Sequence, residues 1–236
     1  LNEFALVPYR VAKDKLSAAR PHQTGIVPLE YLALPSGLDG KSGLNRGKDN
    51  RLSADDDKAA IEAWIAVKAA DNRNTARSYR SQAERFLLWM LFERDKALSS
   101  ATAEDCAAYG KFLADLGSGT PEWKWRIPRR DWIAGKAAKR WHPDWRPFTG
   151  EMTLASRRQA ITVVKGLFAF LTRSRYLEHD PWNEIATPKR SGKRLNVHRI
   201  LTSDQWQAVL DELDGMERGE AYYRLRLALW LLYTSG

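Results

Sequence analysis

The chain has 236 residues, 44% of them hydrophobic, which is enough to bury one core and part of a second. Its formal net charge of +9 at pH 7 favours a polyanionic partner, most simply nucleic acid, over a merely basic soluble protein. The single cysteine, Cys106, excludes an internal disulfide, which fits a reducing compartment. The sequence shows neither a signal-peptide region nor an apolar run of roughly 20 residues. We therefore expect a cytoplasmic protein with no membrane partner.

Residues 1–52 are predicted to lie outside the helical core, as an N-terminal extension and a Gly-rich linker. The first 35 residues show no sustained periodicity, and residues 36–50 hold four glycines among few apolar side chains, which is typical of a mobile linker. Gly40-Lys41-Ser42 is similar to the end of a phosphate-binding P-loop. That loop requires a glycine five residues before Gly40, where this chain has Pro35, so we reject a phosphate loop here.

Helical signals are strong from Ser53 onward, and they predict an all-α fold with a compact bundle of four or five helices over residues 53–187. Ser53 or Asp55 caps a first helix that ends near residue 70. A second helix starts at Asn74 or Thr75. Its apolar face consists of Tyr79, Ala83, Phe86, Leu87, Met90 and Leu91. On the opposite face we place Arg77, Ser81, Glu84 and Leu88, with Arg80 at the border.

Two further helices complete the predicted bundle. The third runs from about Thr102 to Leu116, with acidic residues at its positive end and Cys106 as a small buried side chain. The fourth runs from about Thr153 to Arg173. Its buried stripe consists of Ala160, Ile161, Val164, Leu167, Phe168 and Leu171. Its outward-facing residues are Arg158, Thr162, Lys165 and Ala169.

An unusual insertion, residues 117–150, separates the third and fourth helices. It holds half of the chain's ten tryptophans, namely Trp123, Trp125, Trp132, Trp141 and Trp145. Interleaved with them are the cationic residues Lys124, Arg126, Arg129, Arg130, Lys136, Lys139, Arg140 and Arg146. For the tryptophans, anchoring a proline-containing loop on the bundle competes with stacking on bases or sugars. For the cations we favour contact with phosphates, and both roles are compatible.

The C-terminal part of the chain is predicted to begin a second domain. A basic linker over residues 188–200 leads to Leu201-Thr202-Ser203-Asp204-Gln205-Trp206, which starts a capped helix. Residues 221–236 are an apolar helix and a Thr-Ser-Gly turn, and such a helix needs partners that cover it. We therefore expect residues 201–236 to be the opening of a truncated domain.

Catalytic or metal-binding chemistry is not indicated. His22, His142, His179 and His198 are scattered and have no metal-ligand spacing with cysteine or acidic residues. The sequence suggests no Ser-His-Asp or Cys-His arrangement, and Asp55-Asp56-Asp57 is better explained as the start of a helix. We expect a binding protein that has no catalytic residues and needs no cofactor or metal.

The order of these segments resembles the tyrosine recombinases, also called the phage integrase family. Residues 74–79, followed by the amphipathic helix that ends at residues 86–90, resemble the first core-binding helix of that family. Residues 156–171 resemble its last long helix. The segment 176–182 is similar to the family's Gly-Ile-x-x-Asn-Pro exit, with Asp180 in place of asparagine. The expected fold is therefore the SAM-like core-binding bundle.

The C-terminal segments extend the resemblance to residues 55–236. Residues 201–206 resemble the entry to the catalytic domain, and residues 231–236 resemble the segment before its first catalytic arginine. The family cuts DNA through a tyrosine nucleophile and a 3′-phosphotyrosyl link, with cationic side chains that stabilise the transition state. Those positions would all follow Gly236. The resemblance implies that this chain binds double-stranded DNA without cleaving it, and that the full-length protein joins other recombinase protomers in a synaptic tetramer.

The resemblance further implies a C-shaped clamp whose contacts go mostly to phosphates. On the first core-binding helix these contacts are assigned to Thr75, Arg77 and Arg80. On the last helix they are assigned to Arg157, Arg158, Thr162 and Lys165, and on the linker to Lys189, Arg190, Lys193 and Arg194. The insertion adds Arg126, Arg129, Arg130, Lys139 and Arg140.

Three alternatives stay open. For each assigned residue, the alternative to DNA contact is a solvated basic face. The same bundle also suits a non-enzymatic DNA-binding regulator. A helical module that binds RNA or protein through the Trp-rich insertion is the third alternative. The insertion is longer than the family usually carries at that place, and residues 1–52 match no part of the family.

Overall fold

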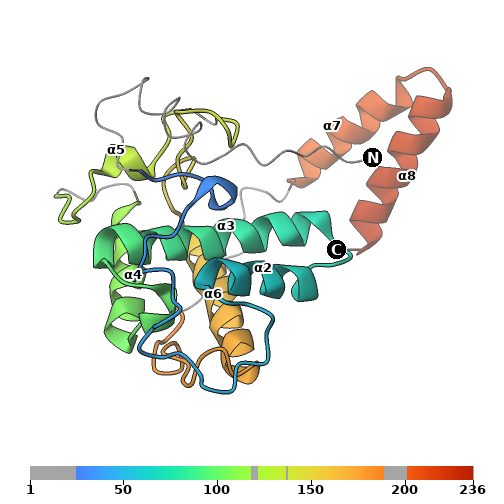
Figure 1. The fold of residues 1–236 in the computed structure, drawn as a ribbon. Helices are drawn as coiled ribbons and strands as arrows, with labels where there is room; N and C mark the ends of the chain where they lie inside the picture. The colour runs from blue at the N-terminus through green and yellow to red at the C-terminus, as the bar shows by residue number, and fades with distance from the viewer. Residues whose placement is uncertain (1–24, 118–121, 137, 189–200, 236) are drawn as a thin grey trace, which may run out of the picture. The chain divides into compact units, whose positions relative to one another are not determined.

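The computed structural model describes residues 25–117, 122–136, 138–188 and 201–235, which form helices joined by loops (Figure 1). Within these ranges the extended pairing is limited to two isolated β-bridges, so the all-α prediction is confirmed. The chain divides into two compact units, Leu1–Lys189 and Arg190–Gly236, and the division falls inside the predicted linker. No helix in the described ranges has the length and apolar character required to cross a membrane.

Four long helices form the body of unit 1, the N-terminal unit. They are α2 (Asp57–Lys68), α3 (Arg73–Trp89), α4 (Ala103–Asp115) and α6 (Leu154–Arg173). Helix α3 packs against α2 and α6, and α6 also packs against α2 and α4. Shorter turns connect them, namely η1 (Leu29–Tyr31), the π-helical turn η2 (Met90–Arg94), η3 (Leu98–Ser100) and α5 (Arg129–Trp132).

Side-chain caps explain where the long helices begin. Asp56 accepts a hydrogen bond from the amide of Ala59, and Asn72 caps α3 in the same way. Thr153 caps α6, and Thr102 forms a reciprocal capping box with Asp105 at the start of α4. The four helices therefore start within four residues of the positions expected from the sequence.

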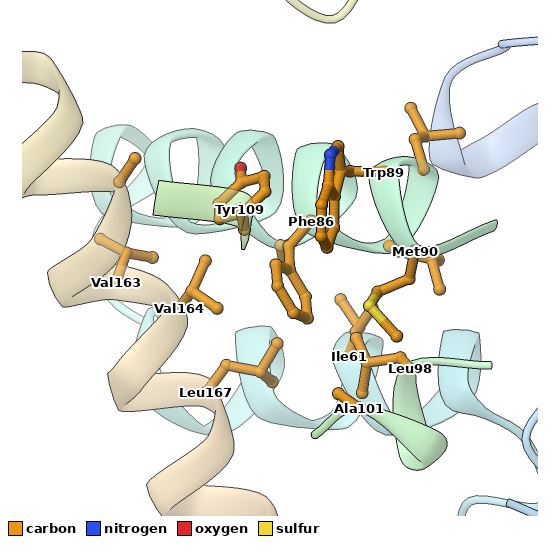
Figure 2. Close-up of a cluster of buried hydrophobic side chains, with 14 of the residues drawn as sticks. Ile61, Phe86, Trp89, Met90, Leu98, Ala101, Tyr109, Val163, Val164 and Leu167 are labelled. Atoms are coloured by element: carbon orange, nitrogen blue, oxygen red, sulfur yellow. The ribbon is translucent and has the colours of Figure 1, made fainter. Parts of the chain in front are cut away.

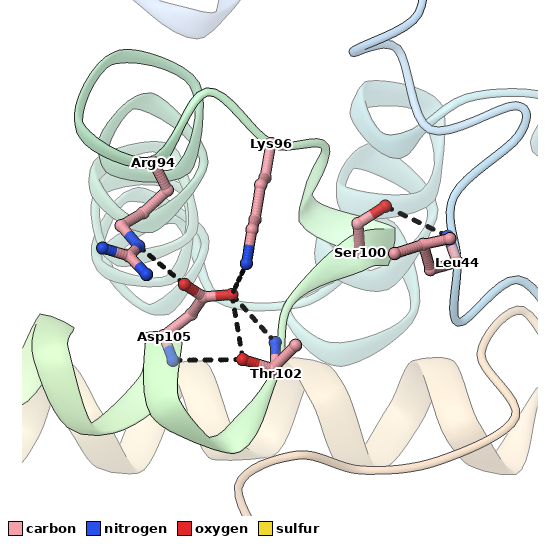
Figure 3. Close-up of polar contacts among 6 residues, drawn as sticks. All are labelled: Leu44, Arg94, Lys96, Ser100, Thr102 and Asp105. Carbon is pink, nitrogen blue, oxygen red and sulfur yellow. Dashed lines mark hydrogen bonds and ion pairs between the residues drawn. The ribbon is translucent and has the colours of Figure 1, made fainter.

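Asp105 also ties the start of α4 to the turn that follows α3 (Figure 3). Its carboxylate accepts hydrogen bonds from Arg94 Nε at 2.6 Å and from Lys96 Nζ at 2.9 Å. Burial by itself raises the pKa of Asp105, but the hydrogen bonds from Lys96 and Arg94 outweigh it and hold that pKa below its ordinary value. The folded structure therefore stabilises the ionised form of the Asp105 carboxylate.

One aromatic-rich core fills unit 1 (Figure 2). The ring of Phe86 from α3 lies at its centre, edge-on to Tyr109 at 4.9 Å and to Phe168 at 5.4 Å between centroids. All six residues of the predicted α6 stripe are buried, and so is Cys106. The predicted buried stripe of α6 and the predicted burial of Cys106 are thus confirmed.

Two expectations for α3 are wrong. Glu84 and Leu88, which the periodicity placed on the outward face, are buried. The amide of Leu29 donates a hydrogen bond of 2.6 Å to Glu84, and Arg140 from the insertion reaches the same carboxylate. Segments distant in sequence cover this second face of α3, so the periodicity of the helix by itself does not reveal its burial.

The Gly-rich stretch 36–50 packs on the bundle, which corrects the prediction of a mobile linker. The side chain of Asn45 donates to the carbonyl of His179 at 2.8 Å and accepts from the amide of that residue at 2.9 Å. The amide of Gly47 donates to the carbonyl of Tyr176 at 2.9 Å. These bonds attach the stretch to the segment that follows α6.

Asp57, the first residue of α2, is fully buried beneath this stretch. Its carboxylate accepts hydrogen bonds from the amide of Ser99 at 3.0 Å, the hydroxyl of Ser99 at 3.2 Å and the hydroxyl of Tyr176 at 2.8 Å. Burial raises the pKa of Asp57 to about 6, although these hydrogen bonds act in the opposite direction. The helix-start cluster predicted from the sequence therefore contains a buried acid.

Unit 2 consists of α7 (Ser203–Asp214) and α8 (Glu220–Ser235). The expected cap of α7 is present, as a capping box between Thr202 and Gln205. Trp206 stacks on Tyr233 with ring centroids 5.1 Å apart. Within the described residues the other large apolar side chains of α8 are mostly exposed, and these are Tyr223, Leu225, Leu227, Trp230, Leu231 and Leu232.

Candidate nucleic-acid interface

Four of the five tryptophans in the insertion anchor it on the bundle. Trp132 and Trp145 are buried, and Trp123 and Trp125 are half-buried against the core. The rings of Trp123, Trp125 and Trp132 lie 6.0, 5.3 and 5.1 Å from Phe112 of α4. For these four, anchoring is the role that the structure favours.

The backbone of the insertion is fixed at Glu93 of η2. This carboxylate accepts hydrogen bonds from the amides of Arg126 and Ile127 at 2.8 and 3.1 Å and from the indole of Trp132 at 3.0 Å. A β-bridge between Ile133 and Phe148 then closes the base of the loop that follows. The loop 133–148 is therefore held at both ends.

Arg140 holds the middle of this loop against the rest of unit 1. Its guanidinium donates two hydrogen bonds of 2.5 Å to Glu30, and bonds of 3.2 and 2.5 Å to Glu84. It also lies over the ring of Trp145, 5.4 Å from the centroid. The hydrogen bonds to Glu30 and then those to Glu84 raise the pKa of Arg140 above its ordinary value. Arg140, assigned above to a phosphate, thus serves the fold in this structure.

The loop forms an open surface hollow of about 720 Å³, called here the basic hollow. It is lined by Arg130, Ile133, Ala134, Gly135, Lys136, Ala138, Lys139, Trp141, His142, Asp144 and Arg146. Four of these side chains are cationic at neutral pH and one is a carboxylate. Trp141 is 63% exposed, and Lys139 Nζ lies 5.8 Å from the centroid of its ring. The hollow therefore combines positive charge with a largely exposed indole.

The other assigned residues of the insertion lie outside the hollow. Arg126 is exposed, and only its backbone takes part in the contact with Glu93. The guanidinium of Arg129 donates to the carbonyl of Leu116 at 3.1 Å and to Glu151 at 3.2 Å. Of the assigned residues in the insertion, Arg130 and Lys139 thus line the basic hollow, whereas Arg126 and Arg129 do not.

The assigned residues of α3 do not line the basic hollow. Arg77 is exposed, and Thr75 and Arg80 are half-buried. The charge of Arg80 acts on Glu30, which also binds Arg140. Helix α3 therefore supplies one exposed cation and one that lies near an acidic residue.

The assigned residues of α6 have partners of their own. Thr162 is exposed, whereas Lys165 donates a hydrogen bond to the carbonyl of Ile185 and its charge acts on Asp180. Arg157 and Arg158 are half-buried, and each has a buried guanidinium nitrogen without a partner among the described residues. In the described part of unit 1, no hydrogen bond or ring contact joins these side chains to the assigned residues of α3.

Four assigned linker residues, Lys189, Arg190, Lys193 and Arg194, lie outside the described residues. Three residues of the basic hollow, Lys136, Trp141 and Arg146, were not predicted as site residues from the sequence. The exposure of Trp141 distinguishes it from the other tryptophans of the insertion, and no sequence pattern indicates that exposure. In the described ranges, no three His, Cys, Asp or Glu side chains gather as a metal site.

Comparison with known proteins gives no further assignment for the chain. It matches no family model, no curated protein and no solved structure. The residues of unit 1, and the basic hollow above all, therefore carry the functional conclusion.

Proposed function

We propose that this protein binds duplex DNA as the core-binding portion of a tyrosine recombinase. The observation that carries the proposal is the basic hollow, whose lining includes four cationic side chains and a single carboxylate. The net charge of +9 supports the proposal, because the summed positive charge of the protein attracts the phosphates of DNA. DNA contacts of this kind position a protein on the duplex without specifying sequence.

The recombinase part of the proposal is supported by the order of capped helices and by the Asp-Pro exit after α6. Helices α2, α3, α4 and α6 form one bundle, consistent with a SAM-like core-binding domain, and a capped α7 follows the basic linker. The exposed apolar side chains of α8 support an association with protein. In the resembled family, other protomers of a synaptic tetramer would be the partners.

Salt dependence of binding tests the DNA proposal. If about six phosphates are neutralised, the logarithm of the association constant should fall against the logarithm of salt concentration with a slope of roughly −5. Fluorescence anisotropy of a labelled duplex, titrated at several salt concentrations, measures this slope. Absence of binding at low salt, or a slope near zero, would contradict the proposal.

A matched pair of variants locates the contact. The double substitution R130A/K136A removes two exposed cations of the hollow and should make the slope less negative by about 2. The control R224A removes a cation of unit 2 that is paired with Glu220, and it should leave the slope unchanged. A change of slope in R224A half as large as that in R130A/K136A, in proportion to the charge removed, would show that binding depends on total charge and not on the hollow.

A further inference from the structure

We propose that the basic hollow holds an unpaired nucleotide of a DNA strand, with the base stacked on Trp141. Lys136, Lys139 and Arg130 then contact the adjoining phosphates. This inference rests on the proposed function and deepens it, because it names the form of DNA that the hollow recognises. Three features of the hollow carry it, namely the exposed indole, the exposed side chains of Arg130, Lys136 and Lys139, and the size of the space.

Trp141 is the one tryptophan of the described insertion whose side chain is mostly exposed. Burial of an indole ring removes a large apolar area from water, and the other four tryptophans of the insertion pack against the core in this way. Trp141 is next to Arg140, whose guanidinium is fixed between Glu30 and Glu84. The indole therefore projects from a well-held backbone without serving the core, as a stacking platform requires.

The cations beside Trp141 are available for a ligand. Lys136, Lys139 and Arg130 are exposed, and within the described residues none of them forms a salt bridge with an acidic side chain. Lys139 lies near the indole at 5.8 Å from the ring centroid, within the range of a cation–π contact. Aromatic faces together with a cationic surface are the usual means of binding single-stranded nucleic acid.

The size and chemistry of the hollow favour an unpaired base over a paired one. Its volume of about 720 Å³ lies in the range of small-molecule sites, which matches a nucleotide. In a duplex, neighbouring base pairs cover both faces of each base, so an indole reaches a base face only where the base is unstacked. Duplex DNA is thus expected to use the cations of the hollow and not Trp141.

The test compares the binding of single-stranded and duplex DNA by variants at Trp141. The probes are a labelled thymidine oligonucleotide of about 12 residues, within the usual site size for such proteins, and a duplex of equal length, both followed by anisotropy. W141A should weaken single-strand binding by about tenfold or more, whereas W141F, which keeps an aromatic face, should stay within about threefold. Duplex affinity should change less than about twofold in both variants.

Controls separate stacking from loss of structure. W230A removes an exposed tryptophan of α8 and should change neither affinity. Circular dichroism melting should show that W141A keeps the wild-type unfolding midpoint, because the side chain lies outside the core. Thymidine monophosphate, added as a competitor, should displace the strand only at concentrations far above the dissociation constant of the oligonucleotide.

Each remaining outcome overturns a specific statement. Unchanged single-strand affinity in W141A, or equal losses for strand and duplex, would overturn the stacking site while leaving duplex binding in place. Efficient competition by the monophosphate would assign the hollow to a free nucleotide and overturn the strand proposal. Absence of binding to either DNA at low salt would overturn the proposed function together with this inference.

Discussion

Asp57 lies where three segments of unit 1 meet. Its carboxylate binds Ser99 of η3 and Tyr176 beyond α6, while its amide donates to the carbonyl of Asp39 at 2.9 Å. A buried acid of this kind is stabilised by its hydrogen bonds and destabilised by the loss of solvent around its charge. The raised pKa, about 6, shows that the loss of solvent has the larger effect.

The substitution D57N tests this balance through pH. Between the ordinary pKa of 3.8 and the folded value of about 6, the folded protein binds more protons than the unfolded chain, so the contribution of Asp57 to stability falls as pH rises. The free energy of unfolding of the wild type minus that of D57N should therefore decrease, by on the order of 2 kcal/mol, from pH 4 to pH 7. Urea unfolding at each pH measures the difference.

The comparison with D57N also removes the effects of other titrating groups. Asp105 has a lowered pKa, so its contribution has the opposite sign and is lost as pH falls, but it is present in both proteins. A difference between wild type and D57N that is the same at pH 4 and pH 7 would show that Asp57 titrates normally in the folded state.

At the scale of elements, the stretch 36–50 depends on close approach of its backbone to the bundle. A β-carbon added at Gly43 would lie 2.0 Å from Ser99 Oγ, and one at Gly47 would lie 2.1 Å from the carbonyl oxygen of Arg175. At Gly40 the nearest atom would be the carboxyl carbon of Asp57, at 2.2 Å. Three of the four glycines that the sequence presents as a sign of flexibility therefore lie where an added β-carbon would collide with its neighbours.

Two glycines of this stretch provide a matched test. Gly37 and Gly40 have nearly equal positive φ angles, +86° and +87°, but a β-carbon at Gly37 meets nothing within 4 Å. G37A should cost about 1–2 kcal/mol of stability through backbone strain alone. G40A should cost at least about 2 kcal/mol more, because the buried Asp57 must lose hydrogen bonds to make room. Equal losses in urea unfolding would contradict the packed arrangement of residues 36–50.

Local signals explain which elements were predictable. The caps at Thr102 and Thr153 and the apolar stripe of α6 depend on neighbours within a few residues, so the sequence predicts those helices and their buried faces. The burial of Glu84 depends on Leu29 and Arg140, more than 50 residues away, and no local pattern indicates it. The concentration of cations and tryptophans in residues 117–150 is visible in the sequence, but the hollow itself and the exposure of Trp141 follow from the path of the loop.

At the scale of the whole molecule, the hydrophobic core belongs to unit 1. Every residue of the main buried cluster lies between Ile26 and Trp182. In unit 2, Leu213 and Tyr222 are buried, but most of the large apolar side chains of α8 remain exposed among the described residues. Stability is thus concentrated in unit 1, and the surface of α8 is available for association.

Truncation after residue 189 tests this distribution. The fragment 1–189 keeps the whole buried cluster, so it should unfold cooperatively with a midpoint within about 3 °C of that of the full chain, measured by circular dichroism. It should also self-associate less in size-exclusion chromatography, because the exposed apolar side chains of α8 are removed. As a control, the fragment 1–150 lacks α6 and with it Val164, Phe168 and Leu171, so it should show no cooperative transition. If 1–189 also fails to unfold cooperatively, unit 1 depends on unit 2 for its stability and the two do not fold independently.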